Sequence, residues 1–128
     1  MADNPEQIIR NFCAAFSNLD ADEVMGYFVE DDPTYHNMPG PPATGSDAVR
    51  ALVEGFLGRW DKTDWQLVNI ASSGNVVFAE RLDVTDEGGK HVDLPCVGVF
   101  ELNDDGKIVT WRDYFDINTY MTAMAPAG

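Results

Sequence analysis

Apolar positions near the start of the chain recur at the 3.6-residue spacing of a helix. Asn4 can cap this helix, Pro5 suits its first position, and Gln7 stands where a capping-box side chain would reach back. The apolar stripe consists of Ile8, Ile9, Phe12, Ala15, Phe16 and Leu19. The pattern therefore predicts an N-terminal helix with one buried face.

Two further helices are predicted in the first half of the chain. A short one begins at Asp20, and a longer one is capped by Ser46 and ends near Asp61. Between them, residues 34–38 are biased toward an extended conformation by the prolines on either side, and residues 39–42 form a rigid proline-rich loop.

The apolar period changes from 3.6 to 2 after Asp61, and β-branched and aromatic residues become frequent. Four strands are predicted, at residues 65–71, 75–85, 91–102 and 107–116. Short glycine-containing turns separate the last three strands, which we therefore expect to be antiparallel neighbours. Helices followed by strands indicate an α+β fold, with helices covering one face of a curved sheet.

Composition and charge limit the class of protein. A length of 128 residues with 45% apolar content predicts one globular domain over residues 1–128. The formal charge of −14 would repel nucleic acid and an anionic membrane surface, so neither is an expected partner. There is no apolar run long enough for a membrane helix, no secretory signal and no CxxC pair, so we expect a cytoplasmic protein with reduced thiols.

Polar residues at positions that should be buried are the first functional signal. In the strand 107–116, Asp113 shares a face with Trp111 and Phe115. In the strand 75–85, Arg81 and Asp83 share a face with apolar residues. An arginine can bridge two carboxylates, which predicts the cluster Asp83-Arg81-Asp113. The alternative is a buried ion network that only fixes the strand register, or an Asp113 that reaches solvent at the strand end.

Tyr35 and Asn37 form a second candidate feature, because alternation places them on one face and His36 on the other. A phenol and an amide at this spacing could hold a water molecule, although an ordinary polar strand end before a proline would look the same. No histidine, cysteine and carboxylate set has metal-ligand spacing, and no G-x-S-x-G, Walker A or G-x-G-x-x-G motif is present. Metal, nucleotide and serine-hydrolase chemistry therefore lose support.

Four segments together resemble the limonene-1,2-epoxide hydrolase family, over nearly the whole chain. They are Tyr35–Pro39, Glu80–Val84, Leu94-Pro95 with Val97–Phe100, and Trp111–Asp116. The resemblance implies an NTF2-like cone, in which a strongly curved mixed β-sheet and three helices from the N-terminal half close a deep apolar pocket. It also implies a homodimer built sheet face to sheet face.

The resemblance also implies a role for each candidate residue. Asp113 corresponds to the general base, Tyr35 and Asn37 to the groups that hold the attacking water, Asp83 to the general acid, and Arg81 to the bridge between the carboxylates. Simultaneous deprotonation of water and protonation of the epoxide oxygen lowers the barrier at both ends, and no cofactor is required.

The substrate-binding wall is predicted from residues that share strand faces with this set, namely Val77, Ala79, Trp111, Phe115 and Val97, with Leu94 and Val99 as further candidates. Each of them could equally be core. Residues 117–124 show helical spacing, which suits a closing helix or dimer packing.

The sequence thus predicts a hydrolase that adds water to a small apolar epoxide. One alternative is a SnoaL-like cyclase or a ketosteroid-isomerase-type proton shuttle, which also needs a pocket acid and base. The other is a non-catalytic ligand-binding or dimerisation module of the same fold. Tyr35 and Asn37 favour the hydrolase, because holding a water is useful only for hydration.

Overall fold

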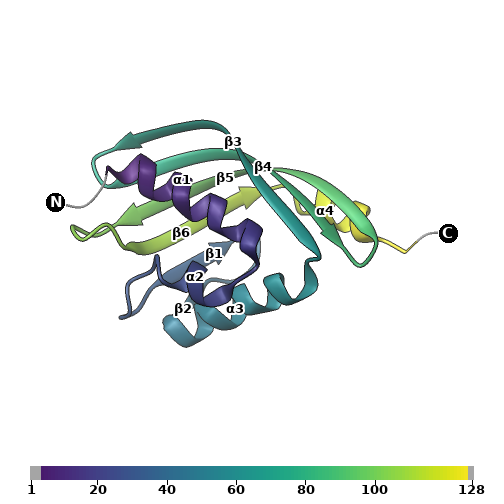
Figure 1. Ribbon diagram of the computed structural model, residues 1–128, viewed down its shortest axis with the longest axis horizontal. Coiled ribbons are helices and arrows are strands. Elements are labelled where there is room, and N and C mark those ends of the chain that lie inside the picture. The colour runs from purple at the N-terminus through teal and green to yellow at the C-terminus, as the bar shows by residue number, and fades with distance from the viewer. Residues whose placement is uncertain (1–3, 127–128) are drawn as a thin grey trace.

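A curved six-stranded sheet packs against the helices found in residues 4–126 (Figure 1). The computed structural model describes residues 4–126. The strands are β1 (Thr34–Asn37), β2 (Ala43–Thr44), β3 (Lys62–Ser73), β4 (Val76–Glu87), β5 (Lys90–Leu102) and β6 (Ile108–Phe115). Their order in the sheet is β2-β1-β6-β5-β4-β3. The predicted antiparallel pairing of β4, β5 and β6 is confirmed, and the parallel pairing of β1 with β6 makes the sheet mixed.

The first helix, α1 (Pro5–Ala15), begins where the sequence predicts. The side chain of Asn4 accepts a hydrogen bond from the backbone N–H of Gln7, and a single 3₁₀ turn, η1 (Phe16–Asn18), follows the helix. Gln7 does not complete a capping box, because its side chain donates to Asn11 instead. Ile9 and Phe12 from the predicted stripe are fully buried.

The other helices agree with the predictions except at one cap. Asp20 caps α2 (Ala21–Met25), and Asp116 caps α4 (Ile117–Met124). The helix α3 (Ser46–Arg59) starts at Ser46 itself, so the prediction that Ser46 is its cap is wrong by one residue. The Ser46 hydroxyl donates instead to the carbonyl of Glu30, which ties the helix to the preceding loop. No helix in residues 4–126 is long and apolar enough to cross a membrane.

Alternation along the strands determines which side chains face the helices. In β4 the odd-numbered residues from Val77 to Thr85 are all buried, as predicted. In β6 the prediction holds for Trp111 and Asp113, but Val109, which strict alternation would place on the same face, is exposed. The pairing of β5 with β6 shifts register there, and Ile108 is turned into the core in place of Val109. Such a bulge inserts one unpaired residue and reverses the faces on one side of it.

The helices α1, α2 and α3 lie on one side of the sheet, and α4 lies at the end where β5 begins (Figure 1). Phe12 of α1 meets the indole of Trp111 edge to face, with 5.1 Å between ring centroids. Trp111 in turn stacks on Tyr35 of β1, at 3.8 Å and 4° between the ring planes. Two members of this aromatic column, Tyr35 and Trp111, also line the candidate site.

Candidate active site

Three buried charged side chains meet above the middle of the sheet. Arg81 donates from Nε and Nη2 to the two oxygens of Asp83, at 2.9 and 2.8 Å. It also donates from Nη1 and Nη2 to the two oxygens of Asp113, at 3.0 and 2.9 Å. The exposed fractions are 1% for Arg81, 7% for Asp83 and 4% for Asp113, so the predicted bridge exists and is shielded from bulk water.

The bridge follows from strand geometry. Arg81 and Asp83 are two residues apart in β4 and therefore point to the same face. Asp113 reaches them from β6, beyond the intervening β5. The guanidinium carbon of Arg81 lies 4.2 Å from the ring centroid of Trp65, so an aromatic face covers the charge on the remaining side.

The two carboxylates are not equivalent. Asp113 receives a third hydrogen bond, from Nε1 of Trp111 to Oδ1 at 2.6 Å. Burial raises the pKa of Asp83, although Arg81 opposes this shift. Burial alone would lower the pKa of Arg81, yet the two aspartates hold it well above its usual range. The arginine therefore stays charged, and Asp83 is suited to holding a proton.

Tyr35 and Asn37 lie beside Asp113 because β1 pairs with β6 in parallel. In this register Asn37 stands opposite Asp113 and Tyr35 opposite Trp111. The backbone N–H of Met38 donates to the carbonyl of Asp113 at 3.0 Å, which continues the pairing. Burial holds the pKa of Tyr35 well above its usual range, so its hydroxyl stays neutral and can donate or accept. His36 points to the other face and contacts the carbonyl of Gly40, as alternation predicts.

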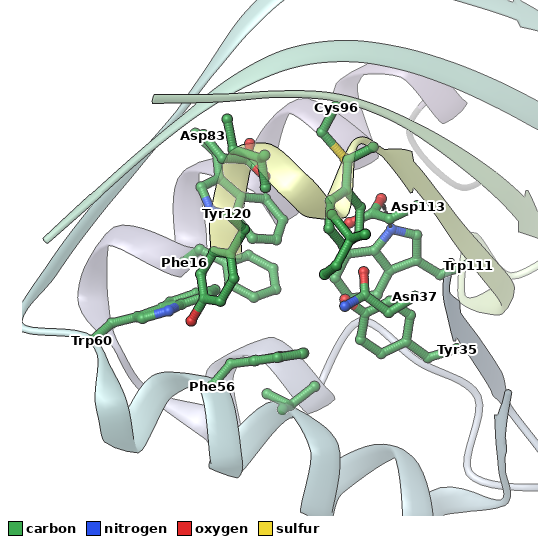
Figure 2. A pocket seen from close by; sticks show the side chains of 15 residues that line it. Phe16, Tyr35, Asn37, Phe56, Trp60, Asp83, Cys96, Trp111, Asp113 and Tyr120 are labelled. Carbon is green, nitrogen blue, oxygen red and sulfur yellow. Dashed lines mark hydrogen bonds between the residues drawn. The ribbon is translucent and has the colours of Figure 1, made fainter. Parts of the chain in front are cut away.

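These groups open into one pocket, with a cavity volume of about 130 Å³. Asp83, Cys96 and Asp113 lie on one side of it, and Phe56 of α3 lies on the opposite side (Figure 2). Most of the wall is apolar and aromatic. The lining residues are Phe16, Tyr35, Asn37, Val53, Phe56, Trp60, Trp65, Asp83, Leu94, Cys96, Trp111, Asp113, Phe115, Ile117 and Tyr120.

The predicted pocket wall is only partly observed. Trp111, Phe115 and Leu94 line the pocket. Val77 and Ala79 are fully buried on the expected sheet face, but they belong to the core and not to the pocket wall.

Val97, and Val99 with it, do not line the pocket either. They lie on the opposite sheet face, because the even-numbered residues of β5 face the helices. Cys96, next to Val97, lines the pocket in its place, with Sγ 3.2 Å from Nη2 of Arg81.

Several pocket residues were not predicted as such. Phe56 belongs to α3 and stacks on Trp60, which follows the end of that helix, and Tyr120 comes from α4. Their helical spacing marked them as apolar-face residues, but only the packing of the helices on the sheet shows which of them border a cavity. Within residues 4–126, no group of three or more histidine, cysteine or acidic side chains is arranged to hold a metal ion.

Comparisons with known proteins agree with this geometry. Structural neighbours that share 13% and 19% identity with the chain are SnoaL-like and NTF2-like proteins, which shows the NTF2-like fold class. The model of the limonene-1,2-epoxide hydrolase catalytic domain matches residues 3–125. The chain belongs to this family.

Individual relatives support the assignment. Epoxide hydrolase EphG from Mycobacterium tuberculosis is 33% identical over 109 residues, which cover 85% of this chain and 71% of that protein. The structure of an M. tuberculosis LEH-like epoxide hydrolase superposes with a TM-score of 0.79 at 28% identity, over 94% of this chain and 88% of the other. The epoxide hydrolase/cyclase-like enzyme SalBIII has a TM-score of 0.80 at 17% identity, over 90% and 92% of the two chains, and at this identity it shows the fold alone.

Proposed function

We propose that this protein is a cofactor-independent epoxide hydrolase that adds water to an epoxide in one step and releases a vicinal diol. The observation that carries the proposal is the Arg81 bridge, which holds two carboxylates at the wall of an apolar pocket. Tyr35 and Asn37 border the same pocket next to one of those carboxylates.

Asp113 is the base in this proposal. It takes a proton from a water molecule that Tyr35 and Asn37 orient, while the water oxygen forms a bond to one epoxide carbon. Three hydrogen bonds from Arg81 and Trp111 fix the direction of the Asp113 carboxylate. Positioning of this kind raises the effective concentration of the attacking water.

Asp83 is the acid. As the ring C–O bond breaks, its proton passes to the epoxide oxygen, which would otherwise leave as a poor alkoxide. A carboxyl with the ordinary pKa of about 3.9 is rarely protonated at neutral pH, so the raised pKa of Asp83 supports this role.

The charge of the buried cluster does not change during the reaction. Before it, Asp113 is ionised, Asp83 is neutral and Arg81 is positive; after it, the two aspartates have exchanged states. A site of constant net charge avoids the large cost of creating an unpaired charge in a medium of low dielectric constant. Return of one proton from Asp113 to Asp83 restores the starting state.

The proposed substrate is a small, uncharged, apolar epoxide. Aromatic rings from α3, α4 and β6 face the cavity, and the charged groups among its lining residues are the two aspartates. An apolar skeleton gains free energy by leaving water for such a wall, whereas a substrate anion would meet two carboxylates.

Cyclisation is the competing reaction, since the same acid and base could activate a substrate hydroxyl. The likeness to SalBIII, described as acting in pyran ring formation in the polyether salinomycin, is low in identity and shows the fold alone. Tyr35 and Asn37 favour hydration, because a site that cyclises its substrate needs no groups to hold water.

The test is a single turnover with excess enzyme in ¹⁸O-labelled water, using cyclic and terpene epoxides and recording product mass. We expect one label in the diol from the first turnover and none in Asp113 after peptide digestion. A label in the Asp113 carboxyl would show an alkyl-enzyme ester and contradict the one-step mechanism. An unlabelled cyclic ether from a hydroxylated epoxide would instead support a cyclase.

We also propose that two copies associate through the outer face of the sheet, opposite the pocket. Phe78, Val97 and Tyr114 are exposed there, and Val97 stands directly opposite Tyr114 in the register of β5 and β6. Light scattering of the parent and of Phe78→Glu tests this proposal, with a dimer expected for the parent and a monomer for the variant. A monomeric parent would contradict it.

A cytoplasmic location is the last part of the proposal. Cys13 and Cys96 are both buried free thiols, which suits a reducing compartment. Immunoblots of fractionated cells of the source should place the protein with soluble cytoplasmic markers, and its recovery in the secreted fraction would contradict this.

A further inference from the structure

The side chain of Arg81 has to pass over a whole strand to reach Asp113. Arg81 belongs to β4, Asp113 to β6, and β5 lies between them. Neighbouring strands are 4.7–4.9 Å apart, so the bridge spans about 10 Å across the sheet. In the register, Gly98 of β5 stands opposite Ala79 on one side and Asp113 on the other. The guanidinium lies above Gly98.

Any side chain at this position would meet the bridge. A Cβ built on Gly98 would lie 2.6 Å from Nη1 of Arg81, 2.9 Å from Oδ1 of Asp113 and 2.8 Å from Cε1 of Phe100. The first two are the atoms that form one of the Arg81–Asp113 hydrogen bonds. The backbone of Gly98 does not itself demand glycine, since its φ lies outside the positive range that the turn glycines adopt.

We propose that Gly98 is a positioning residue for the base, and that the absence of a side chain there allows Arg81 to bridge both carboxylates. The inference rests on the proposed function for its catalytic meaning. A methyl group would push the guanidinium away from Asp113, while the contacts from Nε and Nη2 to Asp83 in the same strand can persist. Asp113 would then lose its hydrogen bonds from Arg81, and with them the direction in which its carboxylate is held.

The kinetic test compares Gly98→Ala with the parent across pH. We expect kcat/KM at neutral pH to fall about 10- to 100-fold, because part of the general-base contribution is lost. The acidic limb of the profile should also move to higher pH, because a nearby cation no longer favours the ionised base. A merely structural defect would lower the rate equally at every pH.

Gly58→Ala is the matched control. Gly58 lies on the exposed side of α3, and a Cβ there meets nothing within 4 Å. We expect this variant to keep the parental rate and pH profile. A Gly98→Ala variant with the parental profile would overturn the proposal.

A second measurement does not depend on activity or on a fully stable Gly98→Ala protein. Lysine at position 81 keeps a cation but has no atom at the place of Nη1. If the clash is with the guanidinium, Gly98→Ala should lower the Tm strongly in the parent and much less in the Arg81→Lys background. Equal losses in both backgrounds would assign the defect to Phe100 or the backbone and overturn the proposal. This thermal cycle stays informative even if no epoxide is hydrolysed.

Discussion

Trp111 donates its indole N–H to Oδ1 of Asp113 at 2.6 Å, from two residues earlier in the same strand. Alternation makes this contact possible, because residues i and i+2 share a face. The donor is thus attached to the same strand as the carboxylate that it orients. It also gives Asp113 a partner that Asp83 lacks, which fixes the orientation of one carboxylate more firmly than that of the other.

Trp111→Phe should therefore lower kcat about tenfold, equivalent to about 1.4 kcal/mol, because a hydrogen bond to a charged group is lost. The ring that stacks on Tyr35 is kept in part. Trp60→Phe is the control for stability, since the buried Nε1 of Trp60 has no partner. Urea unfolding should show a larger loss of free energy for Trp111→Phe; similar losses would mean that the Trp111 hydrogen bond contributes little.

Asp113→Asn should fold but lose hydrolysis by about 10²- to 10⁴-fold, since an amide cannot accept the proton of the attacking water. Circular dichroism and initial rates with the same epoxide measure the two effects. The exposed Asp104 in the β5–β6 turn provides the matched substitution, and Asp104→Asn should keep full activity. A folded Asp113→Asn protein with the parental rate would remove Asp113 from the mechanism.

Arg81→Ala should abolish activity and also destabilise the fold by about 3 to 5 kcal/mol, because two buried carboxylates lose their shared cation. The free energy of unfolding in urea measures the second effect. Arg10→Ala, at an exposed position of α1, should leave both properties nearly unchanged. Parental stability in Arg81→Ala would show that the bridge contributes nothing to the fold.

The raised pKa of Asp83 predicts a pH dependence of stability. The folded state holds this proton more tightly than the unfolded chain does, so the contribution of Asp83 is most favourable below its unfolded pKa of about 3.9. It is lost as the pH rises through the higher folded pKa. Asp83→Asn should therefore gain stability relative to the parent as the pH rises above about 4.

Urea unfolding of both proteins at several pH values in this range measures the difference. Exposed His91 has a raised pKa because of hydrogen bonds to Asp86 and Asp93, but it is present in both proteins and cancels. A parent that becomes more stable than Asp83→Asn with rising pH would mean that Arg81, and not burial, dominates the pKa of Asp83.

Alternation of side chains along a strand predicts the buried face correctly where the strands are regular. In β4 it placed Arg81 and Asp83 on the buried face, and in β1 it separated Tyr35 and Asn37 from His36. It failed at Val109, because a bulge adds a residue without any glycine or proline to mark it.

Pocket walls were harder to predict than the charged cluster. A charged residue at a position that the hydrophobic pattern predicts to be buried can be recognised in the sequence. An apolar residue gives the same sequence pattern whether it packs in a core or lines a cavity. Val77 and Phe56 illustrate this point: the first is core, the second borders the pocket, and only the position of α1 and α3 on the sheet separates them. The prediction for Val97 is wrong because alternation within β5 was not applied to it: the even-numbered residues of this strand face the helices, and Val97 faces the other way.

The polar and the aromatic residues that line the pocket come from different parts of the fold. Asp83, Asp113 and Asn37 stand on strands joined by continuous backbone pairing. Phe56 and Tyr120 project from helices at the border of the pocket, and Trp60 directly follows the end of α3. Helix side chains can change size without altering strand register. Relatives of this chain can therefore diverge in the shape of molecule they accept while the proton-transfer groups stay in place, and laboratory evolution of selectivity should begin at Phe56, Trp60 and Tyr120.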